Sequence, residues 1–244
     1  MAQLAPEVIS SIGSLPITNT VLNTLLVDTT IIGIAVYFKN HVSKIPRAFQ
    51  NGVEYVIESL YNLTESVAGK HTDMVFPYFA TFFIFIIIAN WSGLLPGVGT
   101  IGFFEPTKEG VELFPLLRNA TSDINVTLAL AVISLVITHI YSIRTIGFKE
   151  YLKRWFPLSP LIFIGLLELF SEFIKIISLS FRLFGNIYAG EVLLNTASSL
   201  FAFGLPVPFM MLEVIVGLVQ ALVFSMLTLA FMSILMTSHS EESH

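Results

Sequence analysis

Residues 156–198 read FPLSPLIFIGLLELFSEFIKIISLSFRLFGNIYAGEVLLNTAS, an almost continuous apolar run. As a single helix this run would be roughly 64 Å long, about twice the thickness of the membrane core. Gly185 could bend it, but nothing in its interior offers a place to turn back. The break comes at residues 204–208, GLPVP, after which residues 208–236 are apolar again. We therefore predict a strongly tilted hairpin of two membrane-embedded helices, 156–198 and 208–236.

The composition of the whole chain also indicates a membrane protein. Of its 244 residues, 55% are hydrophobic and only 12% are charged, and the mean hydropathy is +0.81. A soluble domain carries about 25% charged residues, so this chain has too little polar surface for a soluble globule. Its net charge of −5 argues against a nucleic-acid partner. It has no cysteine, which excludes disulfides, thiolate nucleophiles and cysteine-ligated metals.

Three further apolar segments are long enough to cross a membrane, which takes roughly 20 helical residues. They are residues 21–38, 74–95 and 124–143. The first contains Asp28, which faces other helices or lies near the surface; we expect the former. Residues 47–70 repeat apolar positions at three- and four-residue steps, which predicts an amphipathic helix lying in the membrane interface. A helix packed on a soluble partner is the alternative for that segment.

The distribution of charge orients the chain. The connections after the first and third spans are rich in Lys and Arg, whereas residues 96–122 carry more acidic than basic groups. By the positive-inside rule, the basic connections are cytoplasmic or on the equivalent side of an organelle membrane. Residues 1–20 and 96–122 are then outside, and the tail at 237–244 is inside. The predicted fold class is an all-α integral membrane protein, a single membrane domain with about five embedded helices plus the interfacial helix.

The hairpin contains ionisable residues, each of which costs at least about 2.5–3.5 kcal/mol near the centre of a bilayer. They are Glu168, Glu172, Lys175, Arg182, Glu191 and Glu213. Spacings of four and seven residues put one group of polar residues on a common helix face. This group comprises Glu168, Lys175, Ser178, Arg182 and Asn186. Glu191 points from the opposite face, roughly 13 Å along the axis from Arg182. Glu213 and Gln220 form a second, short stripe.

Arg182 is the strongest candidate for a functional charge. An arginine does not give up its proton, and no acidic residue lies three or four positions from Arg182, so its partner must come from elsewhere. Glu172 and Lys175, by contrast, are three residues apart and can neutralise each other, which favours a structural role. Glu191 and Glu213 have no local cation. Carboxyl groups withdrawn from water are suited to relaying protons near neutral pH.

Residues 180–191, SFRLFGNIYAGE, resemble the most recognisable motif of subunit a of the rotary F-type ATP synthase. Further landmarks of that family follow the same order along the chain: residues 90–93 (NWSG), 122–127 (SDINVT) and 220–224 (QALVF). The resemblance covers nearly the whole chain and is weakest before about residue 20. It implies a stator that sits against a rotating ring of c subunits, each with one membrane-embedded carboxyl group.

The resemblance also implies roles for several of these polar residues. Arg182, which Ser178 flanks on the same helix face, matches the family's essential arginine, which faces the ring carboxylates. Glu168 matches the acidic residue of the half-channel open to the inside. Four residues match the half-channel open to the outside: Glu191, Glu213, Asn186 and Gln220. Asp123 and Asn125 match its outer entrance. The implied partners are the c-subunit ring, the peripheral-stalk b subunits, the soluble ATPase head and membrane lipid.

These roles predict a path for ions. A proton from outside passes through Glu191 and Glu213 to a ring carboxyl group, and leaves past Glu168 after a near-complete turn. Arg182 keeps the arriving ring carboxyl ionised and blocks direct hopping between the half-channels. The chain lacks the motif G-x-x-x-x-G-K-[ST], so ATP chemistry belongs to another subunit. We expect a non-catalytic subunit without cofactor or metal.

Some alternatives stay open at this point. The sequence is compatible with a proton or a sodium ion, and with a thylakoid or mitochondrial inner membrane as well as the bacterial plasma membrane that we favour. A secondary transporter with a charged midplane site would show internal repeats, which this sequence lacks. A haem- or quinone-binding subunit would need several histidines in its spans, but only His139 lies in one. We expect His139 to be an interhelical hydrogen-bond partner.

Overall fold

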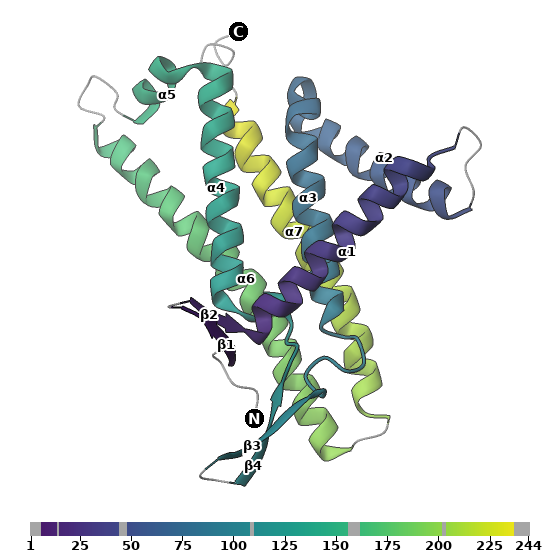
Figure 1. Ribbon diagram of the computed structural model, residues 1–244. Coiled ribbons are helices and arrows are strands. Elements are labelled where there is room, and N and C mark those ends of the chain that lie inside the picture. Colours follow the sequence, from purple (N-terminus) through teal and green to yellow (C-terminus); the bar gives the residue numbers. More distant parts are fainter. Residues whose placement is uncertain are drawn as a thin grey trace.

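The computed structural model describes residues 6–13, 15–43, 48–107, 110–155, 162–201 and 204–236. The chain is mainly helical and carries two short β hairpins (Figure 1). The helices are α1 Asn19–His41, α2 Ala48–Ala68, α3 Thr72–Ser92, α4 Ile124–Ile146, α5 Phe148–Trp155, α6 Ile162–Leu200 and α7 Pro206–Met236. Two 3-10 turns, η1 Gly69–His71 and η2 Ala120–Ser122, join them. The strands are β1 Val8–Ile12, β2 Leu15–Thr18, β3 Gly102–Thr107 and β4 Gly110–Pro115.

Four helical segments in the described part of the chain are long and apolar enough to cross a membrane. They are α1, the continuous α2–α3 segment, α4 and α7. They correspond to the predicted spans 21–38, 74–95, 124–143 and 208–236, the second of which ends at Ser92 and not at residue 95. The fifth long helix, α6, has 39 residues, so it is about 58 Å long. It is not among the four, because it carries all but one of the ionisable residues predicted in the hairpin; Glu213 lies on α7. The prediction of an all-α integral membrane protein is confirmed.

Helix α7 is the centre of the bundle and packs against α2, α3, α4 and α6. Its buried side contributes Phe224 to a core that also contains Phe79 and Phe82 of α3 and Leu183 of α6. The opposite side of the hairpin exposes apolar side chains such as Met211. A large exposed apolar surface is expected where a helix meets lipid or another apolar subunit.

Helices α6 and α7 form the predicted antiparallel hairpin, and α6 crosses α4 obliquely (Figure 1). The turn between them uses Gly204 at φ +89°, a conformation that favours glycine. Pro206 then opens α7, where its missing N–H is no loss because the first turn has no partner for it. The first helix of the hairpin is described from Ile162 onward. Residues 156–161 and the predicted inside tail, 237–244, lie outside the described residues.

Some elements of the structure differ from those predicted from the sequence. Residues within 1–20 and 96–122, predicted as connecting segments, contain the antiparallel pairs β1–β2 and β3–β4. Each strand has only four to six residues, too few to create a long hydrophobic pattern. The predicted helix at 47–70 is α2 followed by η1. The short helix α5 was not predicted as a separate element.

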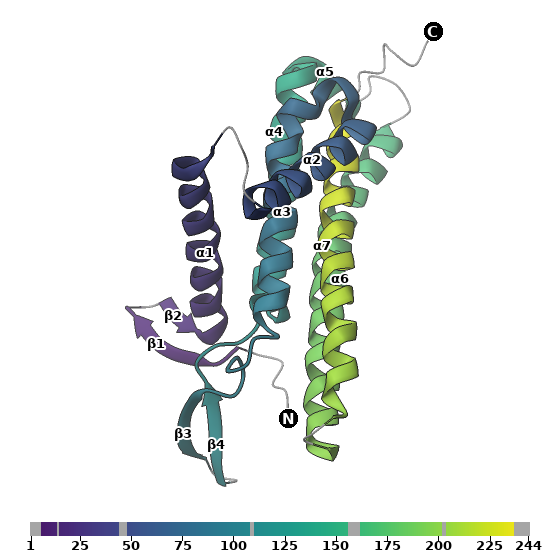
Figure 2. The same ribbon diagram turned by 90° about the vertical axis from the view of Figure 1, so that its right-hand side faces the viewer.

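The elements that connect the long helices lie at two opposite ends of the molecule. Helices α2 and α5 lie at one end, while the two β hairpins and the α6–α7 turn lie at the other (Figures 1 and 2). Figure 2 also shows α1 standing apart from α6 and α7. Its buried residues, Asn19, Thr20, Asn23 and Val27, all lie in its first half. Helix α1 is therefore held to the bundle mainly near its start.

Candidate ion-pathway site

Arg182 lies on the open side of α6. It is exposed, as are Ser178 and Asn186, one turn to either side of it. Leu183 and Ile187 fix the opposite side of the helix in the core, where both are almost completely buried. Among the described residues, no hydrogen bond or ion pair reaches the Arg182 guanidinium. The fold therefore presents a permanent cation at an exposed position among the described residues.

Glu213 and Gln220 are buried on α7 and face α6. The Asn186 amide Nδ2 donates a hydrogen bond to Gln220 Oε1 at 2.7 Å. A Cβ atom added at Gly190 would lie 2.9 Å from Glu213 Oε1, so the carboxyl group packs against the backbone of α6. The predicted face shared by Glu213 and Gln220 is confirmed. The antiparallel hairpin sets these two groups opposite successive turns of α6.

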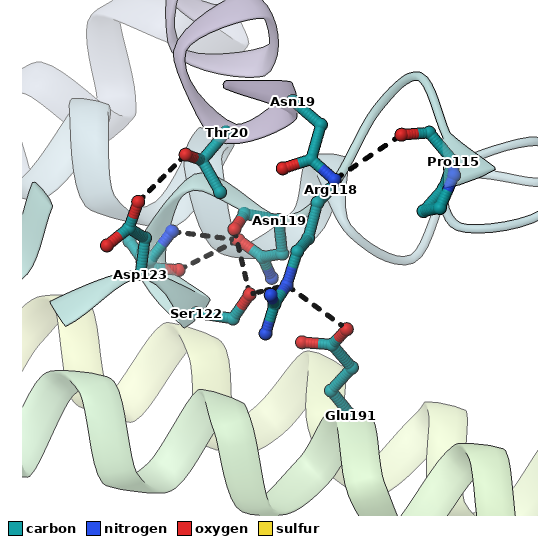
Figure 3. A network of polar contacts seen from close by, with 9 residues as sticks. Asn19, Thr20, Pro115, Arg118, Asn119, Ser122, Asp123 and Glu191 are labelled. Atoms are coloured by element: carbon teal, nitrogen blue, oxygen red, sulfur yellow. Dashed lines mark hydrogen bonds and ion pairs between the residues drawn. The ribbon is translucent and has the colours of Figure 1, made fainter. Parts of the chain in front are cut away.

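Glu191 lies half-buried against residues 116–123 (Figure 3). Its Oε1 atom is 3.6 Å from Nε of Arg118, which also donates a hydrogen bond to Ser122 Oγ at 3.2 Å. Three buried polar atoms on the facing helices make no hydrogen bond with any described residue. They are Glu191 Oε2, Glu213 Oε2 and Gln220 Nε2. Buried polar atoms without partners are costly, so their gathering in one region marks it as a site that can accept another polar group.

Asp123 and Asn125, predicted at the outer entrance, form the start of α4. Asp123 Oδ1 accepts hydrogen bonds from the backbone N–H of Asn125 at 2.9 Å and from its side-chain Nδ2 at 3.0 Å. This is a helix N-cap. Asp123 Oδ2 accepts a hydrogen bond from Thr20 Oγ1 at 2.8 Å, which joins α4 to α1. Asp123 thus has a structural role in the fold, and its place at an entrance stays a prediction.

The expected Glu172–Lys175 pair is confirmed. Glu172 is buried, and Lys175 Nζ donates a hydrogen bond to its Oε1 atom at 2.6 Å. The Lys175 ammonium also lies 4.5 Å from the ring centroid of Phe231. Lys175 therefore turns away from the predicted stripe and toward α7. Glu168, further toward the start of α6, is half-buried.

His139 joins three helices, as expected for an interhelical hydrogen-bond partner. Its Nδ1 atom lies 3.0 Å from the hydroxyl of Tyr151 on α5, and its Nε2 atom lies 3.9 Å from Glu172 Oε2 on α6. Asp28 is half-buried on α1. Within the described ranges, no cluster of three or more His, Asp or Glu residues could hold a metal ion.

Comparison with known proteins places this chain in a family. The family model described as "ATP synthase A chain" matches residues 20–233. The chain belongs to the ATP synthase subunit a family. Proteins named ATP synthase subunit a include one from Moorella thermoacetica, 31% identical over 239 residues that cover 98% of this chain and all of that protein. Another, from Legionella pneumophila, is 31% identical over 225 residues, 91% of this chain and 88% of its own. One from Geotalea uraniireducens is 35% identical over 191 residues, 77% of this chain and 74% of its own.

Family membership fixes the coarse function. The chain is a non-catalytic subunit of the ATP synthase membrane sector, and catalysis takes place in other subunits. One of its landmarks, residues 90–93, positions the hairpin. Asn90 Nδ2 donates a hydrogen bond to the carbonyl of Gly217 at 3.0 Å, and Trp91 Nε1 donates one to the carbonyl of Val214 at 3.1 Å. These bonds hold α7 to the end of α3 next to Glu213.

Sequence reasoning missed Arg118 as a residue of the site. In the sequence it is one of the basic residues in a mainly acidic connection, and no local spacing relates it to Glu191. The contact depends on η2 packing against α6, which is a tertiary arrangement. The available signal was weak: an arginine that lies shortly before the SDINVT landmark at residues 122–127.

Proposed function

We propose that the chain is the ion-translocating stator of its ATP synthase, with two offset proton half-channels that couple proton flow to rotation of a c-subunit ring. The observation that carries the proposal is Arg182, exposed on α6 between Ser178 and Asn186 and bordered by exposed apolar side chains. A charge on a surface within the membrane is costly unless an opposite charge meets it. A ring of membrane-embedded carboxyl groups supplies that opposite charge, and Phe181 and Ile177 supply an apolar surface for the ring to slide against.

The outward half-channel lies between α6 and α7. It comprises Glu191, Glu213, Asn186 and Gln220, with Asp123 and Asn125 at its entrance. The packing of Glu213 against Gly190 and the hydrogen bond between Asn186 and Gln220 support a continuous line of polar groups. The buried oxygens of Glu191 and Glu213 that lack partners among the described residues are the atoms that take up and release the proton.

The inward half-channel contains Glu168. Along α6, Glu168 lies about 21 Å from Arg182 in one direction, and Glu191 lies about 13 Å from it in the other. A proton cannot move directly from one half-channel to the other without passing the fixed cation of Arg182. It travels on the ring instead. Arg182 keeps the ring carboxyl ionised as it passes, because opposite charges at short range favour the charged form.

The orientation follows from the charges at the two ends of the molecule. Lys39, Lys70, Arg144 and Lys149 belong to elements that end or lie at the α2 and α5 end. We assign this end to the cytoplasm and the β hairpins to the outside. The chain is a multi-pass membrane protein, and bacterial relatives support the bacterial plasma membrane as its location. The peripheral-stalk b subunits and the soluble ATPase head complete the complex.

Proton uptake by the two buried carboxyl groups is tested by removing each charge in turn. Membrane vesicles that carry the complete complex with Glu191→Gln or Glu213→Gln are stripped of the ATPase head, and proton flow under a potassium diffusion potential is measured. We expect both variants to assemble and to lose proton flow by about a hundredfold, the scale of a lost proton-transfer group. Glu58→Gln, at an exposed position on α2, is the matched control. Undiminished flow in either test variant removes that residue from the path.

A further inference from the structure

We propose that Arg118 is a positioning residue of the outward half-channel. Its ion pair with Glu191 occupies one carboxylate oxygen and leaves the other to exchange a proton with Glu213 or with the outer water. The inference rests on the proposed function of Glu191 and adds a residue from outside the hairpin. Figure 3 shows the contact, in which Arg118 reaches from the segment above α6 down to the Glu191 carboxylate.

The burial of Arg118 requires a partner of opposite charge. The residue is only 6% exposed, although it lies in the connection between β4 and α4 rather than in a helix. A buried guanidinium is strongly destabilising unless it is paired and hydrogen-bonded. Glu191 provides the opposite charge at 3.6 Å and Ser122 provides a neutral acceptor at 3.2 Å. Both contacts are made through Nε, while the buried Nη2 atom makes no hydrogen bond with any described residue.

The backbone around Arg118 is held in a fixed shape. The Asn119 side chain accepts a hydrogen bond from the Thr121 backbone N–H at 3.1 Å. Ser122 Oγ donates one to the Asn119 carbonyl at 2.9 Å. Both bonds close the η2 turn, so the guanidinium extends from a short rigid loop. A functional group is positioned well only when the residues that support it are themselves locked.

Helix α1 braces both ends of this segment. Asn19 Nδ2 donates a hydrogen bond to the carbonyl of Pro115 at 3.3 Å, just before Arg118. Thr20 donates its bond to Asp123, just after η2. The start of α1 therefore ties down residues 115–123 on either side of the arginine (Figure 3). This arrangement explains why α1, which is otherwise loosely packed, is buried at its first residues.

The two oxygens of Glu191 then have different tasks. Oε1 faces Arg118, whereas Oε2 is buried and makes no hydrogen bond with any described residue. Arg118 cannot itself carry the proton onward, because a guanidinium stays protonated. It fixes the rotamer of Glu191 and so determines where Oε2 points. Arg118 acts through Glu191 and is not on the proton path.

A double-mutant cycle on the complete complex separates this role from that of a simple structural tether. The variants are Arg118→Gln, Glu191→Gln and the two combined, with Arg118→Lys as the conservative variant. Arg144→Gln is the control, because Arg144 is exposed and lies over the ring of Tyr141 on its own helix, α4. Each is reconstituted in head-stripped vesicles, and proton flow per assembled complex is measured, with assembly taken from the amount of chain that copurifies with the c ring.

We expect Arg118→Gln to lower proton flow at least about tenfold, as the loss of a coupled buried pair does, and Arg118→Lys to keep most of it. Proton flow in the combined variant should be no slower than in Glu191→Gln alone, because Glu191→Gln has already removed the carboxylate that Arg118 positions. Multiplied losses in the combined variant, or normal flow in Arg118→Gln, would overturn the inference. If Glu191→Gln itself flows normally, the proposed function of Glu191 has failed instead.

Assembly provides an independent outcome. If Arg118→Gln does not assemble, recovery of the complex in the combined variant supports the inference, because removal of Glu191's charge then relieves the defect. If neither Arg118→Gln nor the combined variant assembles, Arg118 serves only the fold and the inference is overturned. Arg144→Gln should assemble and pass protons at the normal rate.

Discussion

Lys175 and Arg182 lie on the same helix, seven residues apart, yet their surroundings differ completely. The Lys175 ammonium is 2.6 Å from a carboxylate oxygen of Glu172 and lies over the ring of Phe231. Arg182 is exposed and has no such partner within the described part of the chain. The described part of the chain neutralises Lys175 internally and provides no such partner for Arg182. From this difference we predict a packing role for Lys175 and a functional role for Arg182.

The largest difference between these two positions should appear in ATP synthesis. Arg182→Ala is expected to lower the rate driven by an imposed pH gradient at least about a thousandfold, or about 4 kcal/mol. Lys175→Ala should retain most of it, since its role is to neutralise Glu172. The assay uses membranes with equal amounts of assembled complex. An equal loss of ATP synthesis in both variants would show that Lys175 and Arg182 do not differ in role.

Gly190→Ala tests whether proton flow through the outward half-channel depends on the packing of Glu213 against α6. The added Cβ would lie 2.9 Å from Glu213 Oε1, so the carboxyl group must move. We expect proton flow to fall about tenfold, because proton transfer requires hydrogen-bond distances. Gly33→Ala on α1 is the control, since nothing lies within 4 Å of its Cβ position. Normal flow in Gly190→Ala would mean that Glu213 tolerates displacement and does not transfer the proton there.

Glu172→Ala should affect stability and leave function intact. It removes the carboxylate from Lys175 and from the neighbourhood of His139. A partly buried group that loses its charged partner costs about 1–3 kcal/mol. The thermal midpoint of the purified complex should fall, while pumping per assembled complex stays normal. If pumping is lost at full assembly, Glu172 belongs to the inward path and the internal pair has a functional role.

The smallest expected effect is that of Thr20→Val, which removes the hydrogen bond to Asp123. Such a bond contributes about 1 kcal/mol, and Asp123 still caps α4 through Asn125. Limited proteolysis of the complex in detergent should release α1 sooner than in the unchanged protein. An identical cleavage rate would show that Asn19 and Asn23 alone hold the start of α1.

The sequence predicted the parts of this molecule that follow a long pattern. The hairpin, its break at residues 204–208 and the shared face of Glu213 and Gln220 all depend on helical spacing over many residues. The two β hairpins escaped prediction because their strands are too short to produce a pattern. Arg118 escaped because its pairing with Glu191 depends on how a turn packs on a helix, and no spacing along one chain reveals such a contact.

The central claim is that Arg182 separates two half-channels. Its most direct test measures ATP-driven proton pumping and passive proton leak in the same membranes, with Arg182→Ala and the unchanged chain side by side. We expect Arg182→Ala to assemble into a complex that no longer pumps protons. We also expect an increased passive proton leak once the ATPase head is removed, because the fixed cation no longer blocks direct hopping. Normal pumping by Arg182→Ala would show that Arg182 does not separate the half-channels and is a structural charge.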